Sequence, residues 1–82
     1  MKADLDTPIA DISFGASFIR EAKLRKQLDT RIKNTLQRNG IMSLGLLVAC
    51  EATDLPMGLG VISIEVIKAT LRTMGHRLGG GS

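Results

Sequence analysis

The chain has 82 residues, of which 44% are hydrophobic, and its only aromatic residues are Phe14 and Phe18. This length suits one small domain with an aliphatic core and leaves no room for a separate catalytic domain. One cysteine, Cys50, and one histidine, His76, exclude an internal disulfide and a multi-cysteine metal site. Because paired carboxylates and a nucleophile with a nearby base are missing, we expect neither an enzyme nor a cofactor.

The net charge of +3 is unevenly distributed along the chain. Residues 20–38 carry seven basic and two acidic side chains and residues 68–82 carry three basic ones, whereas 1–19 and 39–67 are net acidic. If the basic segments meet on one face, they would attract a polyanion such as nucleic acid. The alternative is a solvated helix surface that keeps a small protein soluble. The absence of Trp and Tyr argues against a stacking platform for single strands.

Residues 1–16 precede the first helical pattern, and we predict an extended segment there. The acidic residues Asp4, Asp6 and Asp11 are not typical of the start of a secretory signal. No run of about 18 apolar residues occurs, so we expect no membrane partner. A lone Cys50 in an apolar run is typical of a buried, reduced thiol, which favours a cytoplasmic location.

The region from Ser17 to Asn39 has a helical pattern, with Ser17 as a candidate cap and Gly40 as a stop signal. Its apolar residues recur every four positions, at Leu24, Leu28, Ile32 and Leu36. Asp29 and Thr30 are good N-caps and unfavourable in helix interiors. We therefore predict a bend or a fresh start there, with 30–38 as a distinct helix.

Two short helical pieces follow. Ser43 is the predicted N-cap of a helix that reaches about Cys50. A single helical turn is expected from Thr53 to Leu55, because Pro56 disfavours helix at the residue before it.

The last predicted helix opens at Val61 or Ser63, runs to about Met74 and ends at Gly75. Its apolar side is expected to hold Ile64, Ile67, Ala69 and Leu71. No alternating strand pattern has a partner to pair with, so we predict an all-α fold, a compact bundle of four to five short helices. The helical domain would span residues 17–78, followed by a flexible Gly/Ser tail at 79–82.

A Gly-x-Gly turn, Gly58-Leu59-Gly60, precedes this helix, and Ser63 lies in its first turn. Backbone amides at the start of a helix can bind a phosphate. A tight turn that binds no ligand is the alternative.

The segment from Thr30 to Leu78 resembles a known family over about 49 of the 82 residues. The strings TRIKNTLQRNGIMSLGLLVACEATDL and GLGVISIEVIKATLRTMGHRL are similar to the C-terminal domain of the bacterial RNA polymerase alpha subunit. That family has a helix starting V-R-S-x-N-x-L, then G-I-x-x-I-G-D-L-V, an acidic stretch and L-G-x-x-S-L-x-E-I-K. The resemblance implies a fold related to helix-hairpin-helix modules, which binds A·T-rich duplex DNA in the minor groove and contacts transcription proteins at the nucleoid.

The family's functional positions fall on residues of this chain. By resemblance, Arg31 takes the place of the arginine that enters the groove, Asn34 that of its partner asparagine, and Gly60 and Ser63 those of phosphate contacts. An Arg and an Asn three positions apart share a helix face, and a guanidinium suits the potential of a narrow A·T-rich groove. The predicted DNA-binding set is Arg31, Lys33, Asn34, Thr35, Gly58, Gly60 and Ser63.

Two positions depart from the family's pattern. Ile62 stands where the family has a lysine, and Val66 stands where it has a glutamate near the helix start. If both are exposed beside Arg31, they form an apolar patch suited to a protein partner. The second hypothesis is therefore a protein-interaction module of the same fold, which binds polymerase, a regulator or another copy of itself. The basic run from Arg20 to Lys26 is additional to the family's pattern and would widen the basic face if it were helical.

Overall fold

The computed structural model describes residues 4–15, 18–56 and 58–79. Within them the chain forms three α-helices and two single turns of 3-10 helix, η1 (Ile9–Asp11) and η2 (Ala52–Asp54), and no β-strand. The all-helical prediction is confirmed, although there are three α-helices in place of the expected four to five short ones. Among the described residues, no helix is both long enough and apolar enough to cross a membrane.

The first helix, α1 (Ala22–Arg38), is continuous over 17 residues. The fresh helix start predicted at Asp29 and Thr30 is therefore wrong, and the basic run from Arg20 to Lys26 leads into the same helix as Arg31. Glu21 is the N-cap residue, with no side-chain cap bond, and Ser17, the predicted cap, lies outside the described residues. Gly40, at φ +82°, follows the end of the helix as expected.

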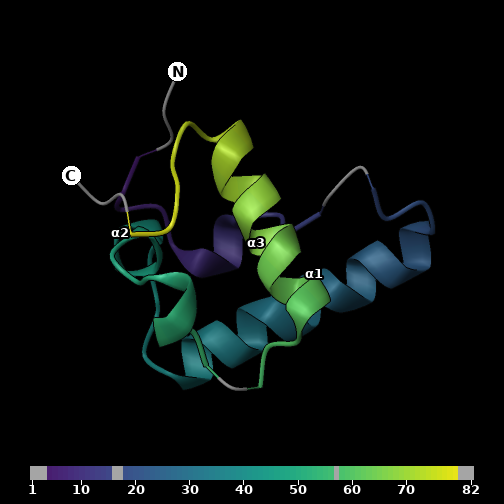
Figure 1. The fold of residues 1–82 in the computed structure, drawn as a ribbon, viewed down its shortest axis with the longest axis horizontal. Helices are drawn as coiled ribbons and strands as arrows, with labels where there is room; N and C mark the ends of the chain where they lie inside the picture. Colours follow the sequence, from purple (N-terminus) through teal and green to yellow (C-terminus); the bar gives the residue numbers. More distant parts are fainter. Residues whose placement is uncertain (1–3, 16–17, 57, 80–82) are drawn as a thin grey trace.

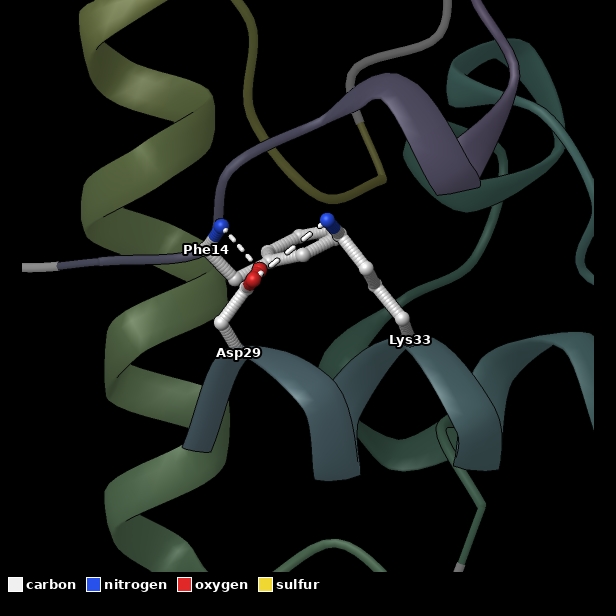
Figure 2. A network of polar contacts seen from close by, with 3 residues as sticks. All are labelled: Phe14, Asp29 and Lys33. Carbon is white, nitrogen blue, oxygen red and sulfur yellow. Dashed lines mark hydrogen bonds and ion pairs between the residues drawn. The ribbon is translucent and has the colours of Figure 1, made fainter. Parts of the chain in front are cut away.

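Asp29 is accommodated inside α1 because its carboxylate is used by one tertiary hydrogen bond and one ion pair within the helix. Its Oδ1 accepts a hydrogen bond from the backbone N–H of Phe14 at 2.7 Å, and its Oδ2 pairs with Lys33 Nζ at 3.3 Å. Figure 2 shows the carboxylate between these two partners, with the Phe14 segment crossing above the helix. The Phe14 N–H therefore has an acceptor, and the N-terminal segment is fixed to α1.

The second helix, α2 (Leu44–Val48), has Ser43 as its N-cap, as predicted, and ends two residues before the predicted Cys50. The Ser43 side chain accepts a hydrogen bond from the Leu46 N–H at 3.3 Å, as an N-cap does. The N-terminal segment is held at this helix start, because the Leu44 N–H donates to the carbonyl of Thr7 at 2.9 Å. The single turn expected at 53–55 is present as η2, one residue earlier.

The third helix, α3 (Val61–Thr73), begins at the earlier of its two predicted positions, with Gly60 as N-cap. Gly75, at φ +78°, lies after its end and allows the reversal that a residue with a Cβ would resist. Figure 1 shows the first turn of α3 next to α1, whereas its last turn lies on the side of both chain ends.

The core combines the N-terminal segment with all three helices. Ile9 and Phe14 are fully buried, together with Ile32 of α1 and Ile67 of α3. The segment predicted as extended and separate therefore contributes to the same core as the helices. The radius of gyration is 11.5 Å, close to the roughly 12 Å expected for a folded chain of this length.

The buried stripe of α3 overlaps the predicted one in part: Ile67 and Leu71 are fully buried, whereas Ile64 and Ala69 are only partly buried against the core. The stripe consists of positions spaced three and four apart: Ser63, Val66, Ile67, Thr70 and Leu71. Ser63 and Thr70 are polar, so a purely apolar pattern did not include them. Thr70 satisfies its hydroxyl by donating to the Val66 carbonyl at 2.9 Å, so it can be buried at little cost.

The C-terminal end of the described chain is pinned to α2. The Gly79 N–H donates to the carbonyls of Val48 and Cys50, at 3.0 and 2.8 Å. The ordered turn therefore includes the first residue of the predicted Gly/Ser tail, and residues 80–82 lie outside the described part of the chain.

Candidate nucleic-acid interface

A groove of about 830 Å³ runs along the exposed face of α1. Eight of its nine lining residues belong to that helix: Lys23, Lys26, Gln27, Thr30, Arg31, Asn34, Thr35 and Arg38. They recur at intervals of three and four, so one face of a continuous helix presents them all. The ninth, Gly58, comes from the turn before α3.

The charge of this groove has one sign. Lys23, Lys26, Arg31 and Arg38 contribute four cations, and no carboxylate is among the lining residues. The remaining α1 residues of the groove carry amide or hydroxyl groups, which can donate hydrogen bonds. A 17-residue helix is about 25 Å long, so these cations can reach several successive phosphates of a nucleic-acid strand.

Arg31 and Asn34, the two residues predicted to be central, are both exposed and line this groove. Thr35 joins them and is half-buried where α1 meets the glycine turn. A Cβ at Gly58 would lie 3.5 Å from Thr35 Cγ2, an ordinary contact distance. The structure therefore brings together four members of the predicted set.

Lys33 does not line the groove. Its ammonium is paired with Asp29 on the side of α1 that faces the Phe14 segment, as Figure 2 shows. Spacing explains this placement, because Lys33 lies four residues after Asp29 on the same continuous helix.

Gly60 and Ser63 lie at the start of α3 and line a neighbouring hollow of about 440 Å³, which they share with Arg31. Gly60 is exposed, and a Cβ there would meet nothing within 4 Å. Ser63 is only 4% exposed, so little of it is open to the phosphate predicted for it. Of the two predicted phosphate contacts at this helix, Gly60 is the accessible one.

The predicted patch of Ile62 and Val66 is half right. Ile62 is 59% exposed, but Val66 is 1% exposed and belongs to the core, so it cannot contact a protein partner. The exposed neighbour of Ile62 is Val61, at 78%. The helical positions of the two residues explain this, because Val66 lies three residues after the buried Ser63 and Val61 lies outside the buried stripe.

The predicted DNA-binding set omits five groove residues: Lys23, Lys26, Gln27, Thr30 and Arg38. Lys23 and Lys26 belong to the basic run that was expected to widen the basic face if it were helical, and the run lies largely in α1. The predicted helix boundary separated the first three from Arg31. The signal that would have included them is the spacing of polar residues, which continues through the predicted boundary at intervals of three and four.

The second basic segment lines a different hollow, of about 740 Å³, at the C-terminal end of α3. Its lining includes Lys68, Arg72 and Arg77 together with the acidic Glu51. The two basic segments therefore do not share one groove. They lie near opposite ends of α3, which Figure 1 shows extending away from α1.

Cys50 is half-buried beside α2, and its thiol donates to the Leu46 carbonyl at 3.4 Å. Burial raises the pKa of this thiol, and the nearby charge of Asp54 raises it further. At neutral pH the sulfur is therefore a thiol and not a reactive thiolate. No group of three or more His, Cys, Asp or Glu residues in the described part of the chain could hold a metal ion.

Comparisons of the chain with protein-family models, with curated proteins and with solved structures found no match.

Proposed function

We propose that this chain is a small module that binds duplex DNA through the groove along α1. The observation that carries the proposal is the groove itself, in which four cations and four hydrogen-bonding side chains share one helix face without an acidic residue. Phosphate contacts dominate the affinity of proteins for DNA, and a positively charged surface of this length can make several of them.

In this proposal Arg31 enters the minor groove of an A·T-rich duplex and Asn34 lies beside it. The narrow minor groove of A-tracts has an enhanced negative potential that attracts a guanidinium, and its base edges offer acceptors to the amide of Asn34. Lys23, Lys26 and Arg38 extend along the backbone on both sides of Arg31. These three side chains would position the helix on the phosphates, whereas Arg31 would supply the preference for A·T pairs.

The glycine turn before α3 supports the same assignment. Gly58 lines the groove, and Gly60 is exposed at the N-terminus of the helix without a side-chain cap. The sugar-phosphate backbone of DNA can approach such a turn closely, and the positive end of the helix dipole favours a phosphate there.

The resemblance to the C-terminal domain of the RNA polymerase alpha subunit extends the proposal. It gives a fold related to helix-hairpin-helix modules, a role in transcription or its regulation, and a cytoplasmic, nucleoid-associated location. The continuous α1 would be this chain's own addition to that plan, because the basic run lengthens the helix that carries Arg31.

A protein-interaction module is the second candidate. The observation that favours it is the exposed apolar pair Val61 and Ile62 at the start of α3, next to Arg31. Exposed apolar patches with a charged border are typical of protein-binding surfaces.

A fluorescence anisotropy titration with labelled A·T-rich and G·C-rich duplexes tests the first candidate. Arg31→Ala is expected to weaken binding to the A·T-rich duplex by about tenfold or more and to reduce the preference over G·C. Arg77→Ala, an exposed arginine in the separate C-terminal hollow, is the matched control and should change the affinity by about twofold at most. Equal affinities of the wild type and Arg31→Ala would exclude the minor-groove proposal.

A further inference from the structure

The hollow of about 440 Å³ that Gly60 and Ser63 share with Arg31 lies between α1 and the first turn of α3. Five of its eight lining residues are aliphatic: Ile19, Leu24, Leu28, Val61 and Ile62. Leu24 and Leu28 are one helical turn apart on α1, and they face the Val61–Ile62 end of α3 across the hollow. The result is an apolar cleft between two helices.

Three of the aliphatic side chains that line this cleft are exposed to solvent. Leu24 is 42% exposed, and Val61 and Ile62 are more exposed still. Covering aliphatic surface of this kind is favourable, because it removes apolar area from water. An apolar cleft bordered by charged residues is the form that a site for an amphipathic helix takes.

The charges around the cleft are mainly positive. Arg31 is part of its lining, and no lining residue is acidic. Lys23 and Lys26 line the adjoining groove, which shares Arg31 with the cleft. Glu65, one turn further along α3, is paired with Lys68 at 3.7 Å. The N-terminus of α3 adds the positive end of a helix dipole, because Gly60 offers no side chain to cap it. The complementary partner is therefore acidic as well as apolar.

We propose that this cleft binds a short amphipathic helix of a partner protein, with aliphatic anchors between Leu24 and Ile62 and carboxylates towards Arg31. Arg31 lines both this cleft and the groove along α1. A carboxylate paired with Arg31 would remove the cation from the minor groove, so the partner helix and DNA compete. The competition rests on the proposed DNA-binding function, whereas the docking site itself does not.

The docking site is tested without DNA. The probe is a fluorescein-labelled synthetic helix of about 16 residues with leucines at i, i+3, i+4 and i+7 and glutamates at its polar positions. The matched control peptide carries lysine in place of every glutamate. The wild type is expected to bind the acidic peptide at least tenfold more tightly than the basic one.

The cleft is tested by Val61→Ser/Ile62→Ser, a change at two exposed positions. The double variant is expected to weaken binding of the acidic peptide by about tenfold or more, because two anchoring contacts are lost. Leu24→Ser tests the opposite wall independently, and circular dichroism checks that each variant is folded. Equal binding of both peptides, or unchanged binding by both folded variants, would overturn the docking site.

The competition is tested by adding unlabelled A·T-rich duplex to the wild-type complex with the acidic peptide. Release of the peptide supports competition at Arg31, and a stable complex of all three components contradicts it. A duplex that does not bind the free protein would refute the proposed function, while the peptide titrations would still decide the docking site.

Discussion

At the scale of single residues, Asp29 shows how a tertiary contact changes the role of a side chain. Aspartate in a helix interior tends to compete with the helix for backbone hydrogen bonds. Here both carboxylate oxygens are engaged elsewhere, one by the Phe14 N–H and the other by Lys33. Phe14 is fully buried, so the same contact that preserves α1 also positions a central side chain of the core.

Asp29→Ala is expected to lower the free energy of unfolding by about 1–2 kcal/mol. The Phe14 N–H loses a charged acceptor, whereas the gain in helix propensity and the partial exposure of Asp29 reduce the loss. Urea denaturation followed by circular dichroism measures the change. Asp29→Asn keeps an acceptor oxygen for Phe14 and should lose less. If Asp29→Ala were as stable as the wild type, the link between the N-terminal segment and α1 would contribute nothing to stability.

At the scale of elements, the helix ends were predictable and the length of α1 was not. Ser43, Gly40 and Gly75 mark helix boundaries through local chemistry, and the structure has a boundary at each. Asp29 carries the same kind of local signal, but its hydrogen-bond partner is 15 residues away. A contact of that range is not visible in the local pattern, so the sequence predicted a boundary where the helix continues.

The start of α3 offers a test at the same scale. Gly60→Asp would cap the helix with a carboxylate and raise the free energy of unfolding by a few tenths of a kcal/mol. It should weaken binding to an A·T-rich duplex by about tenfold, because the new charge repels a phosphate held at this end. Gly60→Ser is the neutral control, which caps the helix without the charge. Equal DNA affinities of the two variants would show that no phosphate approaches α3.

At the scale of the whole molecule, the candidate site depends on which elements meet. Arg31 and Asn34 share a groove because they share a helix, which their spacing predicts. Gly58 joins them because the turn before α3 packs against Thr35. Ser63 and Val66 are buried because they lie on the face of α3 that packs against the core. That face includes the polar residues Ser63 and Thr70, so a pattern based on hydrophobicity does not identify it.

The number of phosphates that the protein contacts is also a property of the whole molecule. Four cations on the phosphates predict that log K falls with log salt concentration with a slope of about −3.5. Lys23→Ala/Lys26→Ala should reduce the steepness by about two units and leave the A·T preference in place. Lys68→Ala/Arg72→Ala, in the C-terminal hollow, is the matched control and should keep the wild-type slope. If the control pair alone reduced the slope, DNA would lie on the opposite end of α3.

The most direct test of the central claim is to map the DNA-binding surface by NMR. Titration of the ¹⁵N-labelled protein with an A·T-rich duplex should shift the backbone amides of α1 from Lys23 to Arg38, with those of Gly58 and Gly60. The amides around Lys68, Arg72 and Arg77 should shift little. Shifts confined to that C-terminal hollow, or no shifts at low salt, would contradict the assignment of the groove along α1 as a DNA-binding site.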